Sequence, residues 1–580
     1  MTGEPQLTTA GAILDAALLE ERWTADRPDP GIAKGEEEER GDEVEELVTA
    51  VFSAALDVER VPRSAAFTAL GGDSLMAISI LSRVWRATGV KLPTRSVVPS
   101  GSVATVAAEL RRARRAGLPA APRVPRRTVT GKEEASENQA AIWFLESGGA
   151  AGPLYNVPYG LRLSGRLDVE ALRVSLRRLV DRHEALRMRF KLEEGRLLQE
   201  PVTAAEAELP LTDLSGLPDP GLRALELGDA HVRTPIDLGN PPLIRPRLLR
   251  LGPRDHLLVL VVHHIVCDAW SIKLMLRELA EGYASPATPD RLPAVPGFLD
   301  FVAWQRSMLD GPEGERLLRY WSGALSDVDA TPLPTDRPRS EARPYVGDAD
   351  PIELDRQVVA DLRRVAGDQG MTLYMLLLSA YSIAIGTCLG RQDVVVGSPV
   401  ANREQESMEK VVGYLANMLP MRVRLEGDPT LRELFGRVRA TALDAYDHQA
   451  LPFARLVREI APPRLDACNP LFQTALVLNE MTPRTFGGLG VSEAILHTGT
   501  SKLDLTCYLE ERRGGGLEGH LEYASALLLP ATARRVRLAF ERALGEIATY
   551  VDQPLSEVQA RLEGALATGE EGRGGDGRGT

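Results

Sequence analysis

The chain has 580 residues, of which 44% are hydrophobic and 26% are charged, as is usual for soluble globular proteins. This length predicts several folding units, each large enough to bury a core. The formal net charge of −13 argues against nucleic-acid binding, which needs a basic face. We recognise neither a signal peptide nor an apolar run of membrane-spanning length. Four scattered cysteines without a CxxC pair fit a reducing compartment, so we expect a cytoplasmic protein without membrane contact.

The first segment, residues 1–39, predicts one short helix followed by a disordered linker. Apolar residues at helical spacing place the helix at residues 7–21. Two prolines and the glutamate run at residues 36–39 predict a solvated linker over residues 22–42. The next unit, residues 40–113, begins with an amphipathic helix at residues 44–56 and closes with another at residues 103–110.

The sequence LGGDSL at residues 70–75 lies at the start of another predicted helix, whose apolar face consists of Leu75, Ile78, Leu81, Val84 and Trp85. Ser74 is therefore placed at a helix N-terminus, where backbone N–H groups and the helix dipole favour an anionic group. The two glycines leave its hydroxyl open to a large partner. The structural alternative is simple N-capping by Ser74 or Asp73.

Seven arginines lie in residues 111–130, a stretch that could be mistaken for a nucleic-acid patch. Three prolines in the same stretch predict a semi-extended spacer instead, and we assign residues 114–132 as an interdomain linker. From residue 133 onward, predicted helices and strands alternate, which indicates an α/β fold. The Gly-rich and polar residues 565–580 predict a disordered tail.

The apolar run at residues 257–262 predicts a buried strand, and HHIVCDAWS follows it directly. Because side chains alternate along a strand, His263 and His264 must point in opposite directions. One imidazole can be held by the scaffold while the other enters a cleft, and Asp268 can orient a ring or hold the loop. A satisfied core histidine beside an exposed one is the competing interpretation. We predict no metal site, because a third ligand at zinc spacing is missing.

Together, LGGDSL and HHIVCDAWS resemble a nonribosomal peptide synthetase, in which a peptidyl carrier domain precedes a condensation domain. The carrier resemblance covers about residues 40–113. The condensation resemblance covers about residues 133–562, with seven motifs in the family's order at residues 136–145, 182–190, 263–271, 298–304, 412–417, 448–453 and 469–473.

The resemblance implies a small all-α four-helix carrier domain followed by an α/β condensation domain. The condensation domain would consist of two subdomains like chloramphenicol acetyltransferase, arranged in a V with a tunnel between them. We divide the two subdomains at residues 133–308 and 309–564.

The resemblance also implies the chemistry. Ser74 would carry covalent 4′-phosphopantetheine, whose thiol holds an aminoacyl or peptidyl thioester. The condensation domain would catalyse attack on that thioester by the amine of an acceptor. We expect His264 to be the central catalytic residue of the set His263, His264 and Asp268, acting as a base or positioning the amine. Arg403 would support Asp268 in an ion pair.

The resemblance further implies the partners. A phosphopantetheinyl transferase would modify Ser74, and the acceptor would arrive on a carrier of another synthetase chain. Because no segment before residue 40 is long enough for an adenylation domain, we expect a separate adenylation enzyme to load the carrier.

Two positions depart from the family pattern, since Ala269 replaces a glycine and Ala141 replaces an arginine. These departures keep open a non-catalytic recruitment domain. An epimerisation domain shares HHxxxD but is disfavoured by the motifs at residues 412–417 and 448–453. A heterocyclisation domain lacks the two histidines, and an acyltransferase acting on soluble coenzyme A thioesters would not need the fused carrier.

Overall fold

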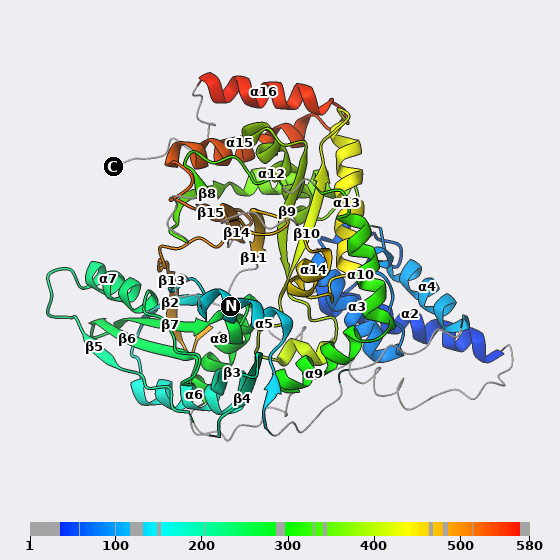
Figure 1. Ribbon diagram of the computed structural model, residues 1–580. Helices are drawn as coiled ribbons and strands as arrows, with labels where there is room; N and C mark the ends of the chain where they lie inside the picture. Colours follow the sequence, from blue (N-terminus) through cyan, green and yellow to red (C-terminus); the bar gives the residue numbers. More distant parts are fainter. Residues whose placement is uncertain are drawn as a thin grey trace, which may run out of the picture.

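A computed structural model describes residues 35–568, except for 57, 73, 99, 117–123, 125–130, 148–151, 204, 286–295, 329–330, 340–344, 463–467, 480–484 and 513. The predicted helix at residues 7–21 and residues 569–580 lie outside the described residues. Figure 1 shows two lobes, each built on a β-sheet, with a helical unit beside one of them. The last helix continues to Thr568, so the start of the predicted tail belongs to a helix.

The helical unit comprises α2 (Gly35–Leu56), η1 (Thr68–Leu70), α3 (Ser74–Thr88), η2 (Thr94–Ser96) and α4 (Val103–Arg115). Their apolar faces share one core, with side chains such as Val48, Ile80 and Leu110 buried. The short turn η2 occupies the position of a fourth helix. α2 begins at Gly35, inside the segment predicted as a linker. Glutamate is a good helix former, and negative charge is favoured in the first turn, so residues 36–39 extend the helix.

The first lobe contains a six-stranded sheet of order β12-β13-β2-β7-β6-β5. Its strands are β12 (Thr485–Phe486), β13 (Leu489–Ala494), β2 (Asn156–Ser164), β7 (Asp255–His263), β6 (Ile244–Gly252) and β5 (Leu211–Asp213). A smaller sheet joins β1 (Glu133–Glu134), β4 (Arg196–Pro201) and β3 (Met188–Glu193). The helices of this lobe are α5 (Glu137–Ser147), α6 (Val169–Arg182), α7 (Pro220–Val232), α8 (Ala269–Ala284) and α9 (Phe298–Leu309).

Strand β7 is buried on both faces, which explains its continuous apolar run. Leu258, Leu260 and Val262 belong to the core that includes α6 and α8. Leu257, Val259 and Val261 belong to a separate core that includes α7. This alternation with period 2 fixes the face on which each histidine leaves the strand.

The second lobe contains a sheet of order β10-β9-β11-β14-β15-β8. Its strands are β8 (Asp348–Leu354), β9 (Asp393–Val400), β10 (Asn417–Arg424), β11 (Thr474–Asn479), β14 (Leu505–Glu511) and β15 (Leu517–Tyr523). Its helices are α10 (Pro312–Ala324), α11 (Arg356–Asp368), α12 (Leu373–Leu389), α13 (Leu431–Asp447), α14 (Phe453–Ile460), α15 (Pro530–Thr549) and α16 (Leu555–Thr568).

Helix α12 lies at the centre of the second lobe, in contact with α11, α13 and α15. The sequence predicts its bounds correctly, because an apolar run of this length is buried on every side. Among the described residues, no single helix is long and apolar enough to cross a membrane. Only α11 and α12 together pass such a test, as a pair bent by 103°.

After its first passage from α9 to α10, the chain returns once to the first lobe and then re-enters the second. Strands β12 and β13 follow β11 in the sequence, yet β13 pairs with β2 in the sheet of the first lobe, with Val491 opposite Leu163. The predicted division near residue 308 does not include this crossover. The returning chain enters β14 through Lys502, which therefore lies near the junction of the lobes.

Candidate active site

His263 and His264 lie at the end of β7, where η4 (His264–Val266) connects the strand to α8. The ring of His263 is buried and both of its nitrogens are occupied. Nε2 lies 2.9 Å from Oε1 of Glu146 on α5, and Nδ1 accepts the N–H of Ile265 at 3.1 Å. His263, predicted as part of the catalytic set, therefore holds the loop and has no free nitrogen for a substrate.

The ring of His264 leaves the strand on the other side and is only partly buried. Its backbone N–H donates to the carbonyl oxygen of Tyr155 at 2.8 Å, and its Nδ1 lies 2.8 Å from the carbonyl oxygen of Cys267. A carbonyl oxygen only accepts, so Nδ1 carries the ring proton. Nε2 of the neutral ring is left with a lone pair. Tyr414 packs against this ring in a T-shaped contact, with centroids 5.0 Å apart.

Burial, with a further contribution from the charge of Lys502, lowers the pKa of His264 to about 4. The imidazole is therefore neutral at physiological pH and accepts hydrogen bonds. A base with this pKa holds a proton weakly in the ground state. The site therefore favours an imidazole that orients an N–H group over one that stores a proton.

Asp268 and Arg403 form the predicted ion pair, with two N–H···O bonds of 2.8 and 3.0 Å. Both side chains are buried. Burial raises the pKa of Asp268, but the charge and hydrogen bonds of Arg403 outweigh burial and hold this pKa below its usual value. Ser271 also donates to Asp268 from its backbone N–H and its hydroxyl, both at 2.8 Å. Asp268 thus caps α8 and fixes the loop.

The second lobe completes the site through residues 411–417. Leu415 and Ala416 donate backbone N–H groups to Asp268 at 3.1 and 3.0 Å. A side chain at Gly413 is excluded, because a Cβ atom there would lie 2.1 Å from the ring of Phe298. Residues from the motifs at 298–304 and 412–417 therefore pack directly against each other.

Asn417 joins further motifs at the junction of the lobes. Its Nδ2 donates to the carbonyl oxygens of Gln449 and Leu451, and its Oδ1 accepts from the N–H of Phe453 at 2.9 Å. Asn138 of α5 donates to the same Oδ1 at 3.3 Å. The motifs at residues 136–145 and 448–453 thus hold the lobes together around His264.

The two departures from the family pattern differ in consequence. Ala269 is the exposed first residue of α8 and does not have a positive φ, so alanine causes no backbone strain there. Ala141 is partly buried on α5, and nothing in the structure explains the missing arginine.

Four residues around the two histidines were missed in the sequence: Glu146, Tyr155, Tyr414 and Lys502. Lys502 places its Nζ 5.8 Å from the centre of the Tyr155 ring, and burial lowers the pKa of Lys502. Sequence spacing gives no sign of these contacts, since each joins segments far apart in the chain. In the sequence, the position of Lys502 just before the apolar strand β14 is the feature that could have drawn attention to it.

Glu409, in η6 (Glu406–Lys410), lies behind the loop, where its carbonyl oxygen accepts from Nε1 of Trp270 at 2.8 Å. Burial raises the pKa of the Glu409 carboxyl to about 7. The folded state therefore binds a proton more tightly than the unfolded state, and stability falls as the pH rises from about 4.5 to about 7.

We expect Glu409→Gln to remove this loss. At pH 8 the variant should exceed the parent in free energy of unfolding by up to about 3 kcal/mol, and near pH 4 the two should converge. Urea unfolding across this pH range measures the difference. Glu426→Gln on an exposed turn is the control and should match the parent throughout. A constant difference between Glu409→Gln and the parent at every pH would contradict the assignment.

Ser74 is the first residue of α3, as predicted. Gly71 ends η1 with φ of 84°, and a Cβ atom at Gly72 would lie 2.3 Å from the ring of Phe67. Only glycines allow this tight entry to the helix. A serine at the start of a helix after such a turn fits the attachment of a phosphate-linked arm.

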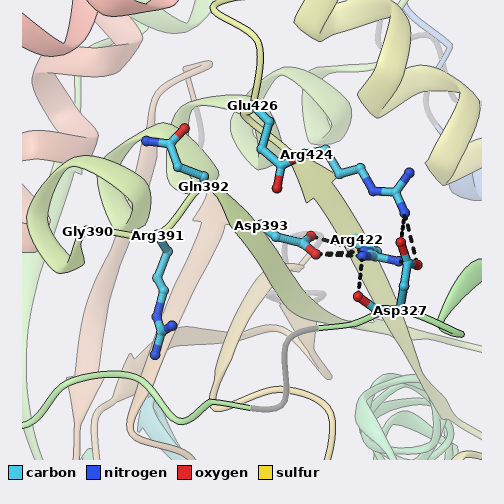
Figure 2. A pocket seen from close by; sticks show the side chains of 8 residues that line it. All are labelled: Asp327, Gly390, Arg391, Gln392, Asp393, Arg422, Arg424 and Glu426. Atoms are coloured by element: carbon cyan, nitrogen blue, oxygen red, sulfur yellow. Dashed lines mark hydrogen bonds and ion pairs between the residues drawn. The ribbon is translucent and has the colours of Figure 1, made fainter.

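A separate pocket of about 490 Å³ lies on the second lobe, at the ends of β9 and β10, and Figure 2 shows the residues around it. Arg422 donates to Asp393, and Arg424 donates to Asp327 at 3.1 Å. Four of the charged residues that line this pocket, Asp327, Asp393, Arg422 and Arg424, are thus paired with one another. None of the described residues around His264 lines it, so we assign the chemistry to the junction of the lobes.

The structure thus places a helical domain, with a serine at a helix start, before two α/β lobes that meet around His264. Residues 129–564 match the family model of the condensation domain, and residues 46–110 match that of the phosphopantetheine attachment site. The chain belongs to the condensation domain family and carries a phosphopantetheine attachment domain, as its motifs predicted.

Known proteins support this assignment. The probable non-canonical nonribosomal peptide synthetase CymA of Salinispora arenicola is 35% identical over 551 residues, which cover 93% of this chain and 7% of that protein. Chondramide synthase cmdD of Chondromyces crocatus is 37% identical over 409 residues, which cover 69% of this chain and 10% of that protein. This chain thus spans about a tenth or less of the length of these relatives.

Among solved structures, the complex of the X-domain and OxyB from teicoplanin biosynthesis aligns with a TM-score of 0.67 and 25% identity. The alignment covers 75% of this chain and 98% of the matched chain. The predicted fold, a helical carrier followed by an α/β condensation domain, is confirmed.

Proposed function

We propose that this protein forms an amide bond in nonribosomal peptide synthesis. Ser74 would hold 4′-phosphopantetheine, whose thiol would supply the thioester link to an aminoacyl or peptidyl group. The α-amine of an acceptor attacks the carbonyl carbon of that thioester. A C–N bond forms, the C–S bond breaks, and the proton lost by the amine is taken up by the leaving thiolate.

The observation that supports this proposal most directly is the free Nε2 of His264 at the junction of the lobes. The Cys267 carbonyl oxygen fixes the tautomer, so Nε2 accepts a hydrogen bond from the attacking amine. This contact aligns the nitrogen lone pair with the carbonyl carbon. Alignment of two reactants can lower the activation barrier by roughly 7–11 kcal/mol. Because the thioester is already activated, this reduction is enough for amide formation. Asp268, Arg403 and His263 position the loop.

The partners follow from this chemistry. An adenylating enzyme supplies the activated acyl group, and a phosphopantetheinyl transferase modifies Ser74. The acceptor amine arrives on a second carrier. The donor is covalently attached to the same chain as His264. A short flexible link of this kind gives an effective concentration of about 1 mM or more.

A second candidate is the recruitment of a partner enzyme without chemistry. It is favoured by the similarity to the X-domain, which was solved in complex with OxyB. Ala269 is compatible with either candidate, because alanine causes no backbone strain at this position.

Transfer between carriers distinguishes the two candidates. The holo protein is charged with an aminoacyl group and mixed with a charged acceptor carrier, and intact-mass analysis follows the aminoacyl group. We expect the acceptor to gain the mass of the donor residue. In Ser74→Ala we expect neither the phosphopantetheine adduct nor transfer, whereas Ser82→Ala on the same helix should retain both. A charged donor that never extends any acceptor would favour recruitment.

A further inference from the structure

One segment, residues 403–416, lies between the carrier and the catalytic loop, and we call it the bridging segment. It includes η6 and connects β9 to β10. Met408, Val411 and Val412 anchor it, because all three are buried. The bridging segment contacts the carrier on one side and the loop of His264 on the other.

The contacts between the carrier and the second lobe include ion pairs. Arg86 of α3 pairs with Glu406, and Nζ of Lys91 lies 2.9 Å from Oε2 of Glu404. Beside the bridging segment, Arg95 pairs with Asp444 on α13 at 3.0 Å. In the carrier, η2 lies against α13 and α3 lies against η6. The basic face of the carrier thus meets an acidic face of the second lobe.

These ion pairs are weak. The carrier side chains are exposed by 38–62%, and exposed ion pairs contribute about 0–1 kcal/mol each. The linker adds one contact, because the N–H of Val124 donates to Oε1 of Gln405 at 2.9 Å.

The contacts with the catalytic loop are buried. Arg403 binds Asp268 through two hydrogen bonds, and Leu415 and Ala416 donate to the same carboxylate. The carbonyl oxygen of Glu409 accepts from Nε1 of Trp270, the second residue of α8. A displacement of η6 would therefore move Trp270 and the groups that hold Asp268, four residues from His264.

We propose that docking of the carrier on Glu404 and Glu406 fixes the position of the bridging segment and, through it, of the loop that presents His264. The docked carrier would then raise the activity of His264 in addition to delivering the donor. The carrier acts here as a positioning element, and Arg86 and Glu406 are positioning residues. This inference rests on the proposed function, since it assumes that His264 serves amide formation. It predicts that an undocked carrier slows the reaction of a donor that is not attached to it.

The test uses a soluble donor. Full-length protein with Ser74→Ala receives an aminoacyl N-acetylcysteamine thioester and a charged acceptor carrier, and product formation is measured at subsaturating donor. We expect Arg86→Glu to slow this reaction by about five- to tenfold, equivalent to roughly 1–1.4 kcal/mol. The double variant Arg86→Glu/Glu406→Arg should restore it. Arg63→Glu is the matched control, because Arg63 pairs with Glu45 inside the carrier.

A second readout follows His264 directly. Its modification by diethyl pyrocarbonate, located by peptide mass spectrometry, should change in rate in Arg86→Glu and return in the double variant. If Arg86→Glu slows only the tethered donor and leaves both the soluble reaction and the His264 modification unchanged, docking is simple delivery and the inference is overturned. If the parent protein forms no amide from either donor, the proposed function fails instead.

Discussion

Replacing Arg403 by alanine is expected to lower the free energy of unfolding by about 3–5 kcal/mol, because it leaves Asp268 charged and buried without its partner. The loop that presents His264 would lose its main anchor, so we also expect amide formation per folded molecule to fall by at least about tenfold. Denaturant unfolding and single-turnover transfer measure the two effects. Arg403→Lys should recover part of the stability, since lysine retains the charge but not the two-pronged geometry.

Arg422→Ala provides a matched control. Arg422 is partly buried and pairs with Asp393 and with the exposed Asp327, but it lies at the pocket of Figure 2, away from His264. We expect a smaller loss of stability than in Arg403→Ala, because the carboxylates left behind are nearer to solvent, with unchanged transfer by the folded protein. Equal losses of transfer in the Arg403 and Arg422 variants would show that the Asp268 pair has no specific role in the loop.

Replacing His264 by alanine is expected to slow amide formation by roughly 10- to 100-fold, the value of one hydrogen bond to a group that gains positive charge. Loading of Ser74 should be unchanged. Because the lowered pKa of His264 keeps the ring neutral, the ratio of parent to variant rates should be constant from about pH 6 to about pH 9. Both rates should rise together as the acceptor amine, with a pKa near 7.7–8.0, loses its proton.

The pH profile separates the two roles that the sequence left open. A ratio that falls below about pH 6.5 would indicate an imidazole that titrates near its ordinary pKa and acts as a general base. The pH dependence of single-turnover transfer, with donor and acceptor preloaded, provides the measurement. His264→Gln is the companion variant, because its amide oxygen also accepts a hydrogen bond but cannot take up a proton.

The parts of the fold that the sequence predicts well are those set by local pattern. α12 and β7 are continuous apolar runs whose length indicates their type, and a helix and a strand are found there as predicted. The Asp268–Arg403 pair followed from motif resemblance, since 135 positions separate its members. No local pattern indicates that Glu146 holds His263 or that Lys502 lowers the pKa of His264. The helical start of α2 was missed because a run of glutamates fits a solvated linker and a first helical turn equally well.

The pairing of β13 with β2 makes the two lobes depend on each other for folding. A protein cut at the sequence boundary near residue 308 would lack β12 and β13 in its first part, and β2 would become an open sheet edge. Exposed edges of this kind invite association between chains. The condensation domain is therefore one cooperative body whose first lobe is finished only after residues 485–494 have been synthesised.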